Sequence, residues 1–111
     1  MSEWITVCKV DDLEPDSGVC ALVDGRQVAI FYIPKIQAIY AIGNYDPIGK
    51  ANVLSRGMIG DIQGEPVVAS PLYKQHFSLK TGVCLEDEKV KTDVYDVRIN
   101  ENGQVEINVA G

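Results

Sequence analysis

The side chains best suited to chemistry in this 111-residue chain are three cysteines and one histidine. Cys8, Cys20 and Cys84 are widely spaced, and no Cys-x-x-Cys or Cys-x-His pattern supports a metal site or a redox pair. We therefore interpret them as three small buried hydrophobic residues in a reducing compartment. His76 has no second histidine near it, so a hydrogen-bonded or exposed strand histidine is favoured over a metal ligand.

Two loops of similar composition are the other candidates for a site. Asn44–Ile48 reads Asn-Tyr-Asp-Pro-Ile, and Ala69–Lys74 reads Ala-Ser-Pro-Leu-Tyr-Lys. Each loop places a proline immediately after a small polar residue, Asp46 in the first and Ser70 in the second. The tight connection Val53–Gly57 lies between them, and its glycine permits a positive φ angle.

Short strands must position these loops. Alternating or β-branched patterns predict strands over residues 4–9, 18–23, 27–33, 37–42, 66–69, 76–79, 83–85, 92–99 and 104–109. Turn signals at 24–25, 63–65, 80–82 and 102–103 separate neighbouring strands, and only a short helical turn at 11–13 is indicated. We predict an all-β, antiparallel sandwich forming one domain over 1–111, with a two-loop subdomain at about 43–85.

Composition excludes several classes of function. The net charge of −6 argues against a nucleic-acid partner. No apolar run reaches the roughly 20 residues of a membrane span, and the N-terminus lacks the pattern of a secretory signal, so we expect a cytoplasmic protein. A single histidine leaves little choice of general base, and no glycine-rich phosphate loop is present. The acidic runs 11–16 and 86–88 are interpreted as solvated connections.

The order and spacing of these motifs resemble a Rieske iron–sulfur domain, in which Cys-x-His and Cys-x-x-His loops hold a [2Fe–2S] cluster. The residues that carry this resemblance are the two loops together with Tyr40-Ala41-Ile42, Leu54-Ser55-Arg56-Gly57, Phe77, Thr81-Gly82, Tyr95, Val97, Gly103 and Val105. The resemblance places Asp46, Ile48, Ser70 and Tyr73 at the four ligand positions. None of the four is a thiolate or an imidazole, so a Rieske-like fold without the cluster is implied.

Further motifs resemble the small subunit of the bacterial NADH-dependent assimilatory nitrite reductase over nearly the whole chain. They are Trp4, Cys8–Leu13, Gly18–Leu22, Val28–Phe31, Asp46-Pro47, Val53–Gly57, Ala69–Leu72, Lys74-Gln75, Cys84 and Glu86–Glu88. The resemblance implies a non-catalytic subunit without a cofactor or an active site of its own. The large partner subunit would hold FAD, siroheme and a [4Fe–4S] centre and would use NADH to reduce nitrite to ammonium in nitrate assimilation.

The roles of Ile48 and Tyr73 remain open at this point. They could point inward as an apolar plug between the loops, with Asp46 hydrogen-bonded to Ser70 or to backbone amides. Alternatively, exposed Ile48 and Tyr73 could form a docking patch with Arg56 and Lys74, since aromatic residues and arginine are favoured at interfaces. A stand-alone binding or regulatory module without metal is the alternative to the nitrite reductase subunit.

Overall fold

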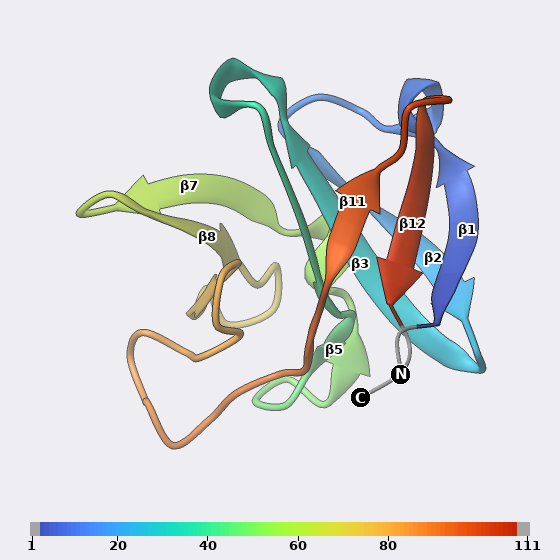
Figure 1. The fold of residues 1–111 in the computed structure, drawn as a ribbon. Helices are drawn as coiled ribbons and strands as arrows, with labels where there is room; N and C mark the ends of the chain where they lie inside the picture. The colour runs from blue at the N-terminus through green and yellow to red at the C-terminus, as the bar shows by residue number, and fades with distance from the viewer. Residues whose placement is uncertain (1–2, 109–111) are drawn as a thin grey trace.

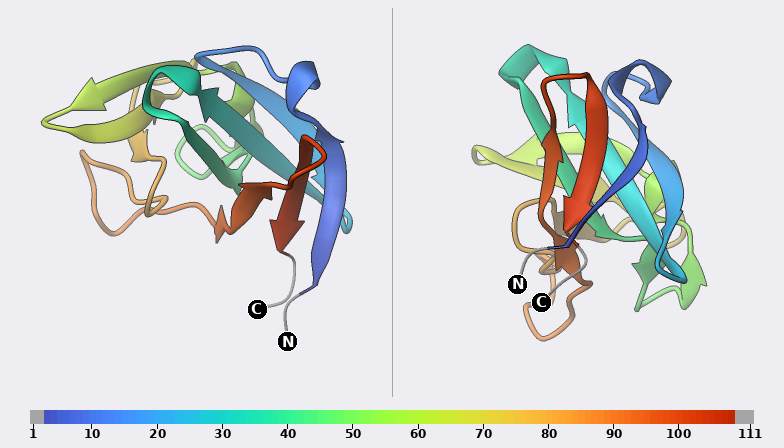
Figure 2. Two further views of the ribbon diagram at one scale, coloured as in Figure 1. Left: turned by 45° about the horizontal axis from the view of Figure 1, so that its top comes forward. Right: turned by 45° about the vertical axis from the view of Figure 1, so that its right-hand side comes forward.

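The structure is a computed structural model that describes residues 3–108 (Figure 1). Its body consists of two antiparallel sheets facing each other (Figure 2). The first sheet has the strand order β10-β4-β3-β2, and its strands are β2 (Ser17–Val23), β3 (Arg26–Ile33), β4 (Ala38–Gly43) and β10 (Val94–Tyr95). The second has the order β1-β12-β11, from β1 (Trp4–Lys9), β12 (Gln104–Asn108) and β11 (Val97–Ile99).

Two smaller sheets carry the loops. One pairs β5 (Tyr45–Asp46) with β6 (Ala51–Asn52), and the other has the order β7-β8-β9, from β7 (Met58–Ile62), β8 (Glu65–Ala69) and β9 (His76–Ser78). The β7–β8 hairpin projects away from the sandwich (Figure 1). Three single-turn 3₁₀ helices complete the described elements: η1 (Val10–Asp12), η2 (Pro34–Ile36) and η3 (Leu54–Arg56).

Strand β3 joins the sandwich to the part that carries the loops, because both of its faces are buried. Val28 and Ile30 face the other sheet of the sandwich, where they pack with Val105 and Ile107. Ala29 and Phe31 face the loop-bearing side and pack with a cluster of buried residues formed by Ile42, Leu54, Val68, Phe77, Leu79 and Cys84. Successive side chains of a strand point to opposite faces, so one apolar run supports both cores. The expected all-β, antiparallel fold is confirmed.

The predicted strand over residues 92–99 is wrong in one respect, because the structure divides it between the two sheets. Val94 and Tyr95 pair with β4, whereas Val97 to Ile99 pair with β12. Val83 and Cys84 form isolated bridges rather than the strand predicted over residues 83–85. Val109, the last residue of the predicted strand 104–109, lies outside the described residues.

Strand β7 was not anticipated from the sequence. It pairs with β8 through the two-residue turn Gln63-Gly64, in which both residues have positive φ angles, +52° and +86°. This backbone twist suits a tight hairpin, so the Gln-Gly pair was the available signal for a strand on each side of it.

Candidate functional site

The loop that connects β5 to β6 and the loop that connects β8 to β9 share one backbone conformation. In the first loop (residues 46–50), the amide of Lys50 donates to the Asp46 carbonyl at 2.7 Å. In the second loop (residues 70–74), the amide of Lys74 donates to the Ser70 carbonyl at 3.0 Å. Both lysines have left-handed backbones, with φ of +58° and +65°. The loops are therefore two copies of one five-residue turn, with a polar residue first, proline second and lysine last.

The Asp46 carboxylate joins the two loops. Its Oδ1 accepts hydrogen bonds from the amides of Ile48 at 2.8 Å and Gly49 at 3.0 Å, and its Oδ2 accepts one from the Ser70 hydroxyl. Asp46 and Ser70 are fully buried. Buried carboxylates need such partners, because an unpaired charge is strongly unfavourable away from water. The hypothesis that Asp46 bonds to Ser70 across the loops is confirmed, whereas the two amides it accepts from belong to its own loop.

Ile48 and Tyr73 differ in orientation. Ile48 is half-buried and packs against the loop-side core, whereas Tyr73 is 65% exposed. The hypothesis of an inward plug is therefore wrong for Tyr73. The apolar contact between the loops comes from Leu72 instead, because a Cβ on Gly49 would lie only 2.4 Å from Leu72 Cδ1. Ile48 and Leu72 are the third residues of their loops, while Tyr73 is a fourth residue and points outward.

Asn44 and Gly57 hold the loops to η3. Buried Asn44 accepts a hydrogen bond from the amide of Ser55 at 2.7 Å through its side-chain oxygen, and its amide nitrogen donates to Gln27 at 3.0 Å. Gly57 has a φ of −75°, so it does not use the positive φ that a glycine permits. Its real constraint is space, since a Cβ there would lie 2.4 Å from the carbonyl oxygen of Ala69.

His76 pairs with Glu86, so the interpretation of residues 86–88 as a purely solvated connection is wrong for Glu86. The His76 amide donates to Glu86 Oε1 at 2.7 Å, and His76 Nδ1 lies 2.6 Å from Glu86 Oε2. Partial burial acts to raise the pKa of Glu86, but the hydrogen bonds and charge of His76 outweigh it, so this pKa is lowered. A hydrogen-bonded strand histidine is confirmed.

The three cysteines are free and differ in exposure. Cys84 is buried, Cys8 is half-buried and Cys20 is exposed, so the expectation of burial is wrong for Cys20. Burial raises the pKa of all three thiols, and for Cys20 the nearby Arg56 charge acts in the opposite direction. Raised thiol pKa values disfavour the reactive thiolate form.

Comparison with known proteins identifies the family. The family of Rieske-like [2Fe–2S] domains matches residues 3–108. The small subunit of nitrite reductase (NADH) from Salmonella typhimurium is 50% identical over 101 residues, which cover 91% of this chain and 94% of that protein. The chain belongs to this Rieske-like family.

Two further comparisons concern nitrite reductase subunits from other organisms. The solution structure of the nitrite reductase small subunit from Erwinia carotovora has a TM-score of 0.81 and 48% identity, covering 100% of this chain and 85% of that chain. The large subunit of nitrite reductase from Klebsiella oxytoca is 38% identical over 102 residues, which are 92% of this chain but 10% of that protein. The Rieske-like fold expected from the loops is confirmed.

The side chains of the two loops do not fit a [2Fe–2S] cluster, although the family is named for one. The Ile48 side chain has no lone pair, Asp46 and Ser70 are hydrogen-bonded to each other, and Tyr73 points to solvent. Such clusters require thiolate or imidazole ligands. Within residues 3–108, no three His, Cys, Asp or Glu side chains form a group that could hold a metal ion. No helix in this range is long and apolar enough to span a membrane.

Proposed function

We propose that this chain is the small subunit of a cytoplasmic NADH-dependent nitrite reductase and docks on the large catalytic subunit. The observation that carries the proposal is the 50% identity to a nitrite reductase small subunit across nearly the full length of both chains. The subunit would contain no electron carrier. In support, Asp46 and Ser70, which stand at two of the four ligand positions given by the resemblance, are hydrogen-bonded to each other.

The large subunit of Klebsiella oxytoca supports the assignment of the partner. A tenth of that protein resembles almost all of the present chain, so in that organism one polypeptide includes both parts. Segments that function side by side are often joined in this way, and joining raises the effective concentration of one for the other. The FAD, siroheme, [4Fe–4S] centre and NADH site would then all belong to the large subunit.

The test is reconstitution of NADH-dependent nitrite reduction from separately purified subunits. We expect the large subunit to bind this chain and to be less active without it, and we expect the isolated chain to contain no stoichiometric iron. A large subunit that neither binds the chain nor responds to it would overturn the proposed function. Stoichiometric iron with visible absorption in the isolated chain would overturn the cluster-free role alone.

A further inference from the structure

The exposed charges of the molecule are distributed unevenly, and the loop end carries cations. Segments 43–58 and 69–76 contain three of the ten Lys and Arg residues, Lys50, Arg56 and Lys74. Of the 16 acidic residues, these segments contain only Asp46, which is buried, and Glu86 contacts them from outside by pairing with His76. The chain as a whole has a net charge of −6, so the loop end is basic while the remainder is strongly acidic.

Exposed apolar side chains lie among these cations. Met58 is 79% exposed, Tyr73 65% and Leu72 45%. We call the group of Lys50, Arg56, Met58, Leu72, Tyr73 and Lys74 the tip surface. Large apolar side chains held in water next to one another are typical of surfaces that bind another molecule. Arginine, methionine and tyrosine are also enriched at the centres of protein interfaces.

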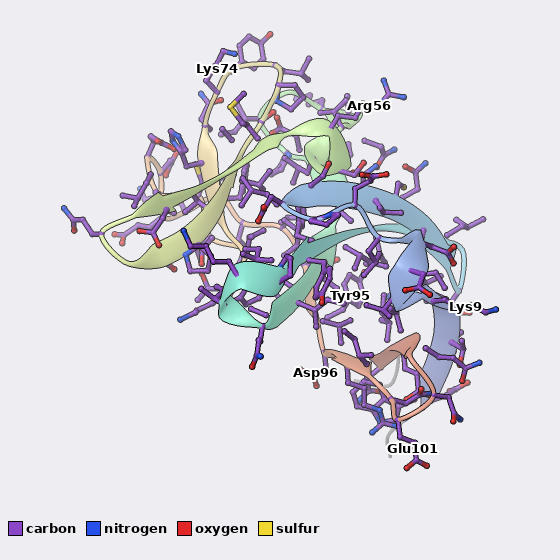
Figure 3. All side chains as sticks on the ribbon, turned by 90° about the horizontal axis from the view of Figure 1, so that it is seen from above. Lys9, Arg56, Lys74, Tyr95, Asp96 and Glu101 are labelled. Carbon is purple, nitrogen blue, oxygen red and sulfur yellow. The ribbon has the colours of Figure 1, made fainter. Side chains whose placement is uncertain are left out.

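One side-chain hydrogen bond and several backbone contacts hold the tip surface together. The Asp46–Ser70 hydrogen bond fixes the first loop beside the second, and each loop ends in its lysine. Met58 pairs across the sheet with Ala69, the residue that precedes the second loop. Figure 3 shows Arg56 and Lys74 toward one end of the molecule, while Asp96 and Glu101 lie toward the opposite end.

The repeated lysine is the most informative detail of this surface. A left-handed backbone is not in itself unusual here, because Asp16, Asp24, Gln37 and Gln63 also adopt it. Glycine is the residue that this backbone favours, yet the last position of both loops is lysine. In residues 3–108, neither lysine nor Arg56 forms an ion pair with an acidic side chain. The three charges are thus available to a partner.

We propose that the tip surface docks onto an acidic patch with an apolar recess on the catalytic subunit. This inference rests on the proposed function and specifies the chemistry of the contact. The lysines and Arg56 would face carboxylates of the partner, while Met58, Leu72 and Tyr73 would fill the recess. Complementary charges of this kind accelerate encounter and make binding sensitive to salt. Ile48, which packs inward, takes no part in the contact.

The decisive measurement is the Kd of this chain for the purified large subunit at low and high salt. Lys74→Glu should weaken binding about tenfold or more at low salt, and the difference from wild type should shrink as salt rises. Lys50→Gly and Lys74→Gly remove a charge while suiting the left-handed backbone, so backbone strain does not explain weaker binding by these variants, and their urea midpoints report whether they fold. Tyr73→Ala should weaken binding at both salt concentrations.

Lys35→Glu is the matched control. Lys35 is exposed in η2, at the opposite end of strand β4 from the first loop. Lys35→Glu changes the charge by the same amount as Lys74→Glu, and the Kd of the Lys35→Glu variant should stay within about twofold of the wild-type value. Equal losses from Lys35→Glu and Lys74→Glu would overturn the tip assignment, and so would unchanged binding by all tip variants. If the wild-type chain fails to bind even at low salt, the proposed function itself fails.

Discussion

The two loops share a backbone and differ in what they do with it. The first loop begins with a buried carboxylate that accepts three hydrogen bonds, and its third residue, Ile48, packs into the core. The second loop begins with a hydroxyl, and its fourth residue, Tyr73, extends into water. The comparison shows that two copies of one turn can have different roles. The first loop secures the subdomain, and the second presents side chains to solvent.

The largest expected effect comes from removing the carboxylate. Asp46→Ala leaves two amides and the Ser70 hydroxyl without their acceptor, so we expect the free energy of unfolding to fall by about 3 kcal/mol. Ser70→Ala leaves Asp46 bonded to both amides and should cost only about 1 kcal/mol. Urea denaturation measures both values. Equal losses would show that the bond to Ser70, and not the bonds to the two amides, accounts for the stabilisation by Asp46.

Truncating the two apolar side chains tests the inward and outward assignments. Ile48→Ala should lower the free energy of unfolding by about 1–2 kcal/mol because it removes a side chain packed on the core. Tyr73→Ala should change it by less than about 0.5 kcal/mol, since exposed side chains contribute little. Thermal and urea unfolding of the two variants compare them directly. A larger loss for Tyr73→Ala would restore the plug hypothesis.

The contact between Gly49 and Leu72 can be tested with a double-mutant cycle. Gly49→Ala places a methyl group against Leu72 Cδ1 and should cost about 1 kcal/mol as the leucine moves aside. In a Leu72→Ala background the same substitution should cost about 0.5 kcal/mol less, because the contact with Cδ1 is gone while those with Asp46 Oδ2 at 3.0 Å and the Cβ of residue 72 at 3.3 Å remain. Additive effects in urea denaturation would mean that Leu72 does not cover Gly49.

The smallest effect concerns pH and the strand that leaves the second loop. The pKa of Glu86 is lowered in the folded protein, so its pairing with His76 stabilises the fold above the usual Glu value of 4.5. This stabilisation is lost as the pH falls through the lowered pKa. Glu86→Gln should therefore show a smaller drop in urea midpoint between neutral and acidic pH than wild type. An identical acid dependence in both proteins would contradict a role for the pair.

Local patterns were enough to predict most strands and the hydrogen bonding of Asp46. Trp4–Lys9 was predicted to the residue, because β-branched enrichment is a property of the segment itself. The similarity of the two loops was also predicted from the sequence, but without Lys50, the last residue of the first loop. Asp46-Pro47-x-x-Lys50 and Ser70-Pro71-x-x-Lys74 are the same pattern, and that spacing was the signal for Lys50.

The sequence by itself determined most strands, the turns and the paired loops, since alternation and proline and glycine positions act over a few residues. Only the tertiary structure decided that residues 92–99 divide between two sheets, because pairing depends on strands distant in the chain. The tertiary structure also decided two close contacts between segments: Gly57 lies against Ala69, and Leu72 covers Gly49. The outward direction of Tyr73 follows from the same packing, since Leu72 already occupies the contact between the loops.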